Sequence, residues 1–199
     1  MTPRVYAVVA AAGRSRRMGT QKLLLPFGGT TVLGRVVKSL LAAPVSGVVV
    51  VVSPEGNDVA AEATRAGGGT TINPDGDGDM LSSIRCGLRA LPPDCDAALV
   101  ALGDQPTLRA AVVSEMVGVL SSRPDAIVVP ACDGVRGHPL LVPSKWFDDV
   151  LARYDETGLR GLLSEHPDAV VELAVADGRI LEDMDDPDAY QRAVRSLER

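Results

Sequence analysis

A segment near the start of the chain, AAAGRSRRMGTQK at residues 10–22, places a cluster of positive charges directly after an apolar run, VYAVV. Its first four residues have little or no side chain, so their backbone can approach a ligand closely and donate N–H groups to it. Arg14, Arg17 and Lys22 place cations beside that backbone. Small residues followed by clustered cations favour a polyphosphate ligand, and a solvated basic turn is the alternative.

The glycines of this segment do not have the spacing of the common phosphate-binding motifs. Five residues separate Gly13 from Gly19, and no GK[ST] follows, so the segment is not a P-loop. The G-x-G-x-x-G pattern of dinucleotide-binding loops is also missing. The charges, rather than a known glycine pattern, therefore carry the prediction of a phosphate site.

A carboxylate follows another apolar run, because GDQP at residues 103–106 ends the segment AALVAL. At the carboxyl end of a central strand and opposite a phosphate loop, Asp104 is well placed to hold Mg²⁺. The alternative is that Asp104 caps a helix that begins near Thr107.

A second acidic cluster, EDMDDPDAY at residues 182–190, precedes the last helical segment. For Asp186 and Asp188 we favour a role at the helix N-terminus, where carboxylates interact well with the helix dipole. For Asp183 and Asp185 that role and metal binding remain equally open.

Strand-like and helix-like segments alternate along the chain and must position these residues. The strand-like segments are 5–11, 47–53, 70–74, 97–104 and 125–131, and the helix-like segments are 31–43, 57–66, 80–91, 107–122 and 186–199. This alternation predicts one α/β domain over residues 1–199, with an open, doubly wound, mostly parallel sheet and helices on both faces. Ligands of such sheets bind beyond the carboxyl ends of the strands. After Gly134 the pattern loosens, which indicates an inserted or edge region.

The composition limits the partners of the protein. A net charge of −6 argues against a nucleic-acid partner, which needs a broad basic surface. The apolar run at residues 48–52 is far too short to cross a membrane. Cys86, Cys95 and Cys132 form no C-x-x-C pair, so we expect free packing residues in a reducing, cytoplasmic setting.

Together these segments resemble the nucleotidyltransferase superfamily, specifically the molybdenum cofactor cytidylyltransferase-like proteins. That family opens with LAAGxSxRMGxxK, then LLLP and a glycine pair, which AAAGRSRRMGTQKLLLPFGG at residues 10–29 matches almost throughout. GDQP, a GHP at residues 137–139 and a late D-x-D-x-P at residues 183–187 match as well.

The resemblance implies a Rossmann-like sheet of the GT-A type that binds a nucleoside triphosphate on the opening loop. It implies that Arg17 and Lys22 hold the triphosphate and act with Asp104 in catalysis, and that Asp104 and Asp185 hold Mg²⁺. The implied nucleotide-binding residues are Ala11, Ala12, Gly13, Arg14, Ser15, Arg17, Lys22, Asn73 and Ser82, and the implied acceptor-binding residues are Gly137 and His138. Two alanines before the loop glycine resemble the pattern of those family members that use a cytidine nucleotide. The resemblance therefore implies CTP as the nucleotide.

Two motifs depart from the family pattern. Where G-M-S-S-S is common, this chain has DMLSS, with Asp79 and Leu81 replacing the first and third residues, and Asp186 replaces a usual threonine. The reaction class is unaffected, whereas the choice of base and acceptor stays open.

The reaction that fits is attack of an acceptor phosphate on the α-phosphorus of CTP, with pyrophosphate leaving. Molybdopterin is the acceptor that the resemblance implies, and the product would pass to a molybdoenzyme or a chaperone. A sugar phosphate or another phosphorylated cofactor precursor is an alternative acceptor. A regulatory module that binds CTP without turnover is an alternative of another class.

Overall fold

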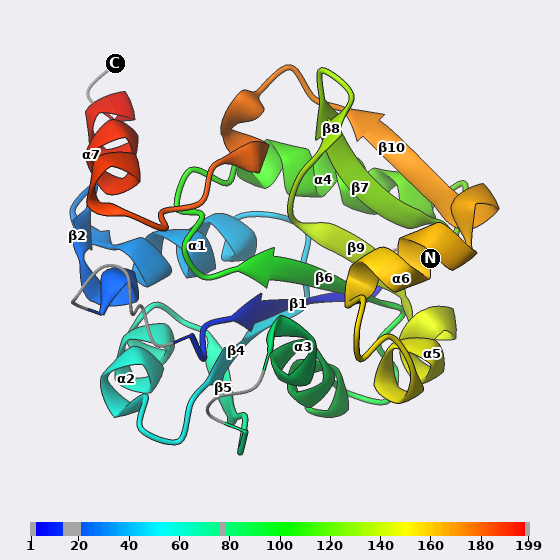
Figure 1. Ribbon diagram of the computed structural model, residues 1–199, viewed down its shortest axis with the longest axis horizontal. Helices are drawn as coiled ribbons and strands as arrows, with labels where there is room; N and C mark the ends of the chain where they lie inside the picture. Colours follow the sequence, from blue (N-terminus) through cyan, green and yellow to red (C-terminus); the bar gives the residue numbers. More distant parts are fainter. Residues whose placement is uncertain (1–2, 14–20, 76–78, 198–199) are drawn as a thin grey trace.

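The structure is a computed structural model that describes residues 3–13, 21–75 and 79–197. Its centre is an eight-stranded sheet in the order β10-β7-β9-β6-β1-β4-β5, with β8 paired to β7 (Figure 1). The strands of this sheet are β1 (Val5–Ala10), β4 (Gly47–Val52), β5 (Gly69–Ile72), β6 (Ala97–Leu102), β7 (Ile127–Cys132), β8 (Val135–Arg136), β9 (Leu140–Pro143) and β10 (Val170–Ala174). A separate two-stranded hairpin joins β2 (Pro26–Phe27) to β3 (Thr30–Thr31).

Helices cover both faces of the sheet (Figure 1). They are α1 (Val32–Leu41), α2 (Asn57–Arg65), α3 (Met80–Arg89), α4 (Ala110–Leu120), α5 (Phe147–Ala152), α6 (Leu159–Glu165) and α7 (Pro187–Ser196), with short 3₁₀ turns η1 (Lys22–Leu24), η2 (Ser144–Trp146), η3 (Pro167–Ala169) and η4 (Gly178–Leu181). One apolar core lies between the sheet and α1, α2 and α4, and a second lies between the sheet and α3, α5 and α6. The α/β class with helices on both faces is as the sequence predicts.

The four strands β6, β1, β4 and β5 are mutually parallel, which brings their carboxyl ends to one edge of the sheet. In this register Ala10 lies opposite both Leu102 and Val51. The loops that follow β1, β5 and β6 therefore leave the sheet at the same edge. They lead into or contain Lys22, Asn73, Ser82 and Asp104, whereas the other predicted site residues of the described chain after β6 lie before β9 and before α7.

The segment after Gly134 contains both an inserted strand and an edge strand of the sheet. It contains β9, which runs antiparallel between β6 and β7 and is buried along its whole length. The predicted inserted or edge region is thus confirmed, with β9 inserted centrally and β10 at the edge of the sheet. Four apolar residues with no alternation, LLVP, give no periodicity from which a central position could be read.

Within the described residues, no helix is long and apolar enough to cross a membrane. All three cysteines are free, and Cys95 and Cys132 are buried as predicted, whereas Cys86 is half-buried beside β5.

Candidate active site

One lysine lies between two carboxylates at the carboxyl edge of the sheet. The Nζ of Lys22 is 2.5 Å from Oδ2 of Asp104 and 2.9 Å from Oδ1 of Asp185. Lys22 begins η1, Asp104 follows β6 after one residue, and Asp185 lies just before α7. Three of the residues for which the sequence predicts phosphate or metal chemistry therefore meet at one point.

The loops after β1 and β6 can meet because of Gly103. Its N–H donates to the carbonyl oxygen of Ala10 at 3.1 Å, and a Cβ on it would lie 3.0 Å from that oxygen and 3.4 Å from the side chain of Leu23. A larger residue would push these loops apart. The absence of a side chain thus lets Asp104 lie beside Lys22.

The late acidic segment reaches Lys22 because it is fixed on both sides. Met184 is buried between Asp183 and Asp185, and the hydroxyl of Tyr190 in α7 donates to the carbonyl oxygen of Pro26 at 2.7 Å. These contacts hold the end of the chain against the hairpin that follows η1.

Asp104 and Asp186 have different roles, because only the second is a helix cap. Helix α4 begins at Ala110 with Arg109 as its N-cap, so the capping alternative for Asp104 is wrong. Asp186 caps α7 as predicted, since its Oδ1 accepts from the N–H of Ala189 at 2.7 Å.

The charged groups of this cluster shift the pKa values of one another. Partial burial opposes the charge of Lys22, but its hydrogen bonds to Asp104 and Asp185 and their negative charges raise the pKa of Lys22 above the ordinary value. Burial and the charges of Asp185 and Asp104 raise the pKa of the Asp183 carboxyl, although Lys22 opposes this. Asp183 thus adds negative potential beside the pair that Lys22 bridges.

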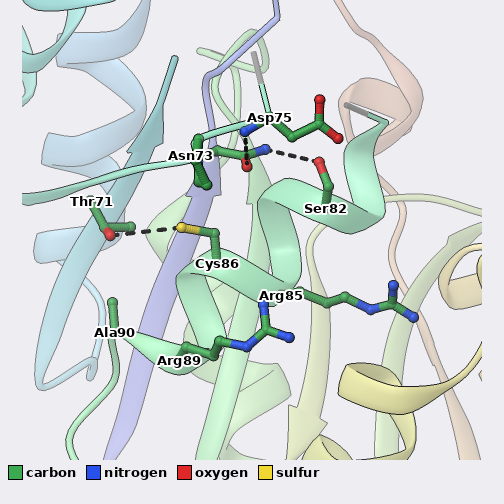
Figure 2. Close-up of a pocket in the computed structure, with 9 residues that line it drawn as sticks. Thr71, Asn73, Asp75, Ser82, Arg85, Cys86, Arg89 and Ala90 are labelled. Carbon is green, nitrogen blue, oxygen red and sulfur yellow. Dashed lines mark hydrogen bonds between the residues drawn. The ribbon is translucent and has the colours of Figure 1, made fainter. Parts of the chain in front are cut away.

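Asn73 organises the first turn of α3. It is 3% exposed, and its Nδ2 donates to Oγ of Ser82 at 2.8 Å and to Oγ of Ser83 at 3.2 Å. Its Oδ1 accepts from the N–H of Asp75 at 3.1 Å (Figure 2). Asp79 caps the same helix by accepting from the N–H of Ser82 at 2.8 Å. Asn73 is therefore engaged on both sides of its amide and positions Ser82.

A pocket of about 550 Å³ opens between the end of β5 and α3 (Figure 2). Asn73 and Ser82, which the sequence predicts together in nucleotide binding, both line it. Sequence reasoning missed Arg85 and Arg89, which line it as well. Arg85 donates to the carbonyl oxygens of Val150 and Arg153, so it anchors the segment after α5 to α3.

The opening loop is described in part. The N–H of Ala11 donates to the carbonyl oxygen of Val51 at 3.0 Å, and Ala11 is buried as part of the apolar core. A Cβ on Gly13 would have no neighbour within 4 Å, which leaves open space at this residue. The predicted residues Arg14, Ser15 and Arg17 lie outside the described residues.

Gly137 and His138 enter β9 beside η4. The N–H of His138 donates to the carbonyl oxygen of Ile180 at 3.1 Å, and a Cβ on Gly137 would lie 2.5 Å from that oxygen. Burial lowers the pKa of His138, although the charges of Asp104 and Asp183 oppose this. Burial thus favours the neutral form of the imidazole, which shares the electrostatic field of the carboxylate cluster.

The model of the MobA-like NTP transferase domain matches residues 7–170 of the chain. The chain belongs to the MobA-like NTP transferase family. The resemblance to molybdenum cofactor cytidylyltransferase-like nucleotidyltransferases is therefore confirmed.

The chain is similar in sequence to two cytidylyltransferases and in structure to a third protein. The molybdenum cofactor cytidylyltransferase of Escherichia coli is 28% identical over 94% of this chain and 93% of its own length. A 2-C-methyl-D-erythritol 4-phosphate cytidylyltransferase of Streptomyces coelicolor is 30% identical over 92% of this chain and 71% of its own length. Rv0371c of Mycobacterium tuberculosis has a TM-score of 0.85 at 29% identity, covering 96% of this chain and 98% of that one. A structure of Rv0371c in complex with manganese has a TM-score of 0.80 at 27% identity, covering 97% of this chain and 99% of that one.

The carboxylates of this MobA-like nucleotidyltransferase suit a hard divalent cation. Asp104 and Asp185 both lie within reach of one ammonium, so their oxygens point to a common position. In the described ranges, no group of three or more His, Cys, Asp or Glu side chains could hold a metal ion. Mg²⁺ is commonly bound by one or two carboxylates together with substrate phosphates and water. The pair therefore fits an ion that is completed by the triphosphate.

Arg160 is a residue of this nucleotidyltransferase that sequence reasoning missed. It lies in the first turn of α6 and is exposed, and its side chain makes no hydrogen bond or ion pair within the described parts of the chain. Its positive charge contributes to the lowered pKa of His138. No motif precedes it, and a single arginine on a short helix gives no signal in the sequence.

Proposed function

We propose that this MobA-like nucleotidyltransferase transfers CMP from CTP to the terminal phosphate of a molybdopterin-type acceptor and releases pyrophosphate, with Mg²⁺ as cofactor. The observation that carries the proposal is the meeting of Lys22, Asp104 and Asp185 at the carboxyl edge of the sheet. Cations and metal-binding carboxylates at that edge are what a triphosphate requires.

The reaction is a displacement at the α-phosphorus. An oxygen of the acceptor phosphate forms a bond to the α-phosphorus, the bond from that phosphorus to the β-phosphate oxygen breaks, and pyrophosphate leaves with the electron pair. A phosphate monoester has a second pKa of about 6, so the acceptor is mostly dianionic at neutral pH and no strong general base is needed. This agrees with a site in which burial lowers the pKa of the nearby histidine, His138.

The chain's own residues have distinct tasks in this proposal. Lys22 binds the triphosphate and neutralises charge that develops on the leaving pyrophosphate, and Arg17 does the same from the opening loop. Asp104 and Asp185 would hold Mg²⁺, which supplies charge neutralisation at the phosphate oxygens when it is bound. Ser82, held by Asn73, lines the pocket beside α3, to which we assign the nucleotide. The manganese in the structure of Rv0371c, a protein of similar structure, supports the proposal of a divalent cation here.

We assign the acceptor to the side of the site that His138 and Arg160 share. A dianionic acceptor phosphate must approach a region that contains Asp104, Asp183 and Asp185, whose charges repel it. Arg160, with no other partner in the described residues, supplies a cation on that side. The product would then pass to a molybdoenzyme or its chaperone.

CTP and molybdopterin have different degrees of support. Both relatives described above are named cytidylyltransferases, and the alanines at 11 and 12 agree with a cytidine nucleotide. The acceptors in their names differ, and the Streptomyces relative favours a sugar-alcohol phosphate as a second candidate.

The test is a pyrophosphate-release screen of CTP, GTP, ATP and UTP against molybdopterin, 2-C-methyl-D-erythritol 4-phosphate and common sugar phosphates. We expect the highest kcat/KM for CTP with molybdopterin. Turnover of CTP with a sugar phosphate alone would retain the reaction and replace the acceptor. Binding of CTP with no pyrophosphate release for any acceptor would contradict the proposal and favour a regulatory module.

A further inference from the structure

We propose that Lys22 is a built-in counter-cation that holds Asp104 and Asp185 together in the nucleotide-free protein, keeps a divalent metal ion out, and gives up this place when a triphosphate arrives. The inference rests on the proposed function in one respect, namely that this carboxylate pair is the metal site. It goes further because it makes metal binding depend on nucleotide binding through one side chain.

The geometry places the ammonium where a shared cation would be. Lys22 Nζ contacts one oxygen of each carboxylate, at 2.5 Å and 2.9 Å. A metal ion bridging the same two oxygens would occupy nearly the same position, because Mg²⁺ binds carboxylate oxygens at about 2.1 Å. The ammonium and the metal ion therefore exclude each other sterically, and their like charges repel.

The surroundings make the ammonium costly to displace without a replacement partner. The side chains of Lys22 and Asp104 are 14% and 15% exposed, so neither is fully solvated. Removing the partner of a charge in such a position is destabilising, because the remaining charge is left uncompensated. A metal ion that enters alone would gain the carboxylates but would leave Lys22 without them.

A nucleoside triphosphate removes this cost. Its negatively charged phosphates offer Lys22 new partners at the same edge of the sheet, and they also complete the coordination of the metal ion. The bound triphosphate thus raises the affinity for the metal, and by linkage the metal raises the affinity for the triphosphate by the same factor. The empty enzyme is expected to stay metal-free at metal concentrations that saturate the nucleotide complex.

The test measures Mn²⁺ binding by calorimetry and by the paramagnetic signal of free Mn²⁺, with no nucleotide or acceptor present. We compare the wild-type protein with Lys22→Met, which keeps the length of the side chain and removes its charge. Lys145→Met is the matched control, because Lys145 Nζ lies 3.0 Å from Oδ2 of Asp125 in an exposed pair elsewhere. We expect Lys22→Met to bind Mn²⁺ about tenfold more tightly than wild type, which lies within the range of typical coupling between sites. Lys145→Met should bind as wild type does.

A double variant, Lys22→Met with Asp104→Asn, locates the gain. If the gain arises at this carboxylate pair, the double variant loses it. Unchanged or weaker Mn²⁺ binding by folded Lys22→Met would overturn the proposal. Since this measurement needs no turnover, it stays informative even if the screen of acceptors finds no pyrophosphate release.

A measurement on the wild-type protein covers the case in which Lys22→Met does not fold. The ammonium group of Lys22 can be followed by NMR of lysine side-chain N–H groups while Mg²⁺ is added with and without CTP. We expect the signal to change at low Mg²⁺ only when CTP is present. A change at the same low Mg²⁺ without CTP would contradict the proposal, because the metal would then displace Lys22 unaided.

Discussion

The two halves of the molecule build their parts of the site in different ways. In the first half, which ends with α4, Lys22, Asn73, Ser82 and Asp104 all lie in loops or helix starts that follow parallel strands. In the second half, His138 precedes an antiparallel strand and Asp185 lies in an irregular segment before α7. The regular half carries the expected nucleotide contacts, and the irregular half carries the expected acceptor contacts.

The difference shows which side-chain positions of this enzyme are fixed by the sheet and which can vary. Regular β-α turns tie the position of a side chain to the register of the sheet, whereas irregular segments depend on a few individual contacts. Lys22 joins the halves, since its bond to Asp185 spans 163 residues of sequence. We infer that the choice of acceptor belongs to the second half, whereas the reaction itself needs both halves, because Lys22 and Asp104 lie in the first and Asp185 lies in the second.

The largest expected effect is that of Asp104→Asn, which removes a metal-binding carboxylate from the first half. It keeps the shape of the side chain and removes the charge that a metal ion and Lys22 require. We expect turnover to fall by about a hundredfold to a thousandfold, the scale seen when one main electrostatic contribution is lost. Pyrophosphate release across a Mg²⁺ titration measures this, with thermal denaturation beside it.

Asp125→Asn is the control for that change, because Asp125 also pairs with a lysine but lies exposed. Its turnover should match the wild type. An Asp104→Asn protein with wild-type turnover at ordinary Mg²⁺ would remove Asp104 from the metal site.

Asn73→Ala should destabilise the first half of the protein at the start of α3. The change removes a buried amide and leaves Ser82 and Ser83 without their donor, so we expect the free energy of unfolding to fall by about 1–3 kcal/mol. KM for CTP should rise with a smaller change in kcat. Urea denaturation and steady-state kinetics measure the two effects, and unchanged stability would show that the amide does not hold α3.

Arg160→Ala tests the second half. We expect KM for the acceptor to rise about tenfold, which corresponds to about 1.4 kcal/mol, while KM for CTP stays near its wild-type value. Arg35→Ala removes another exposed arginine, on α1, and serves as the control. An equal rise in both KM values would place Arg160 outside the acceptor side.

The smallest expected effect is the loss of stability in Asp186→Ala, which distinguishes the role of Asp186 from that of its neighbour Asp185. Asp186→Ala removes the cap of α7 and should lower the free energy of unfolding by about 1 kcal/mol, whereas Asp186→Asn should cost almost nothing. Asp185→Asn should do the reverse, with a loss of turnover and little change in stability. Thermal denaturation and pyrophosphate release on the three variants would show whether the roles are divided in this way.

The same contrast between halves explains what could be predicted from the sequence. The parallel strands and the loops after them follow from long apolar segments and regular alternation, so Lys22 and Asp104 could be placed at one edge. The central position of β9 could not, because four apolar residues carry no period and pairing with β6 and β7 is a tertiary choice. Arg160 was missed because its place depends on how α6 packs. The engagement of Asn73 with two serines also needed the structure, since the sequence gives its type and not its partners.

The central claim is that an acceptor phosphate attacks the α-phosphorus of CTP at the site of Lys22, Asp104 and Asp185. Its most direct test uses the acceptor that the screen identifies, with its phosphate labelled with heavy oxygen, followed by phosphorus NMR of the product. The account predicts a new diphosphate whose bridging oxygen carries the label, formed together with pyrophosphate by the wild type and greatly slowed in Asp104→Asn. Unlabelled CMP that has taken its oxygen from water, with no diphosphate formed, would contradict it.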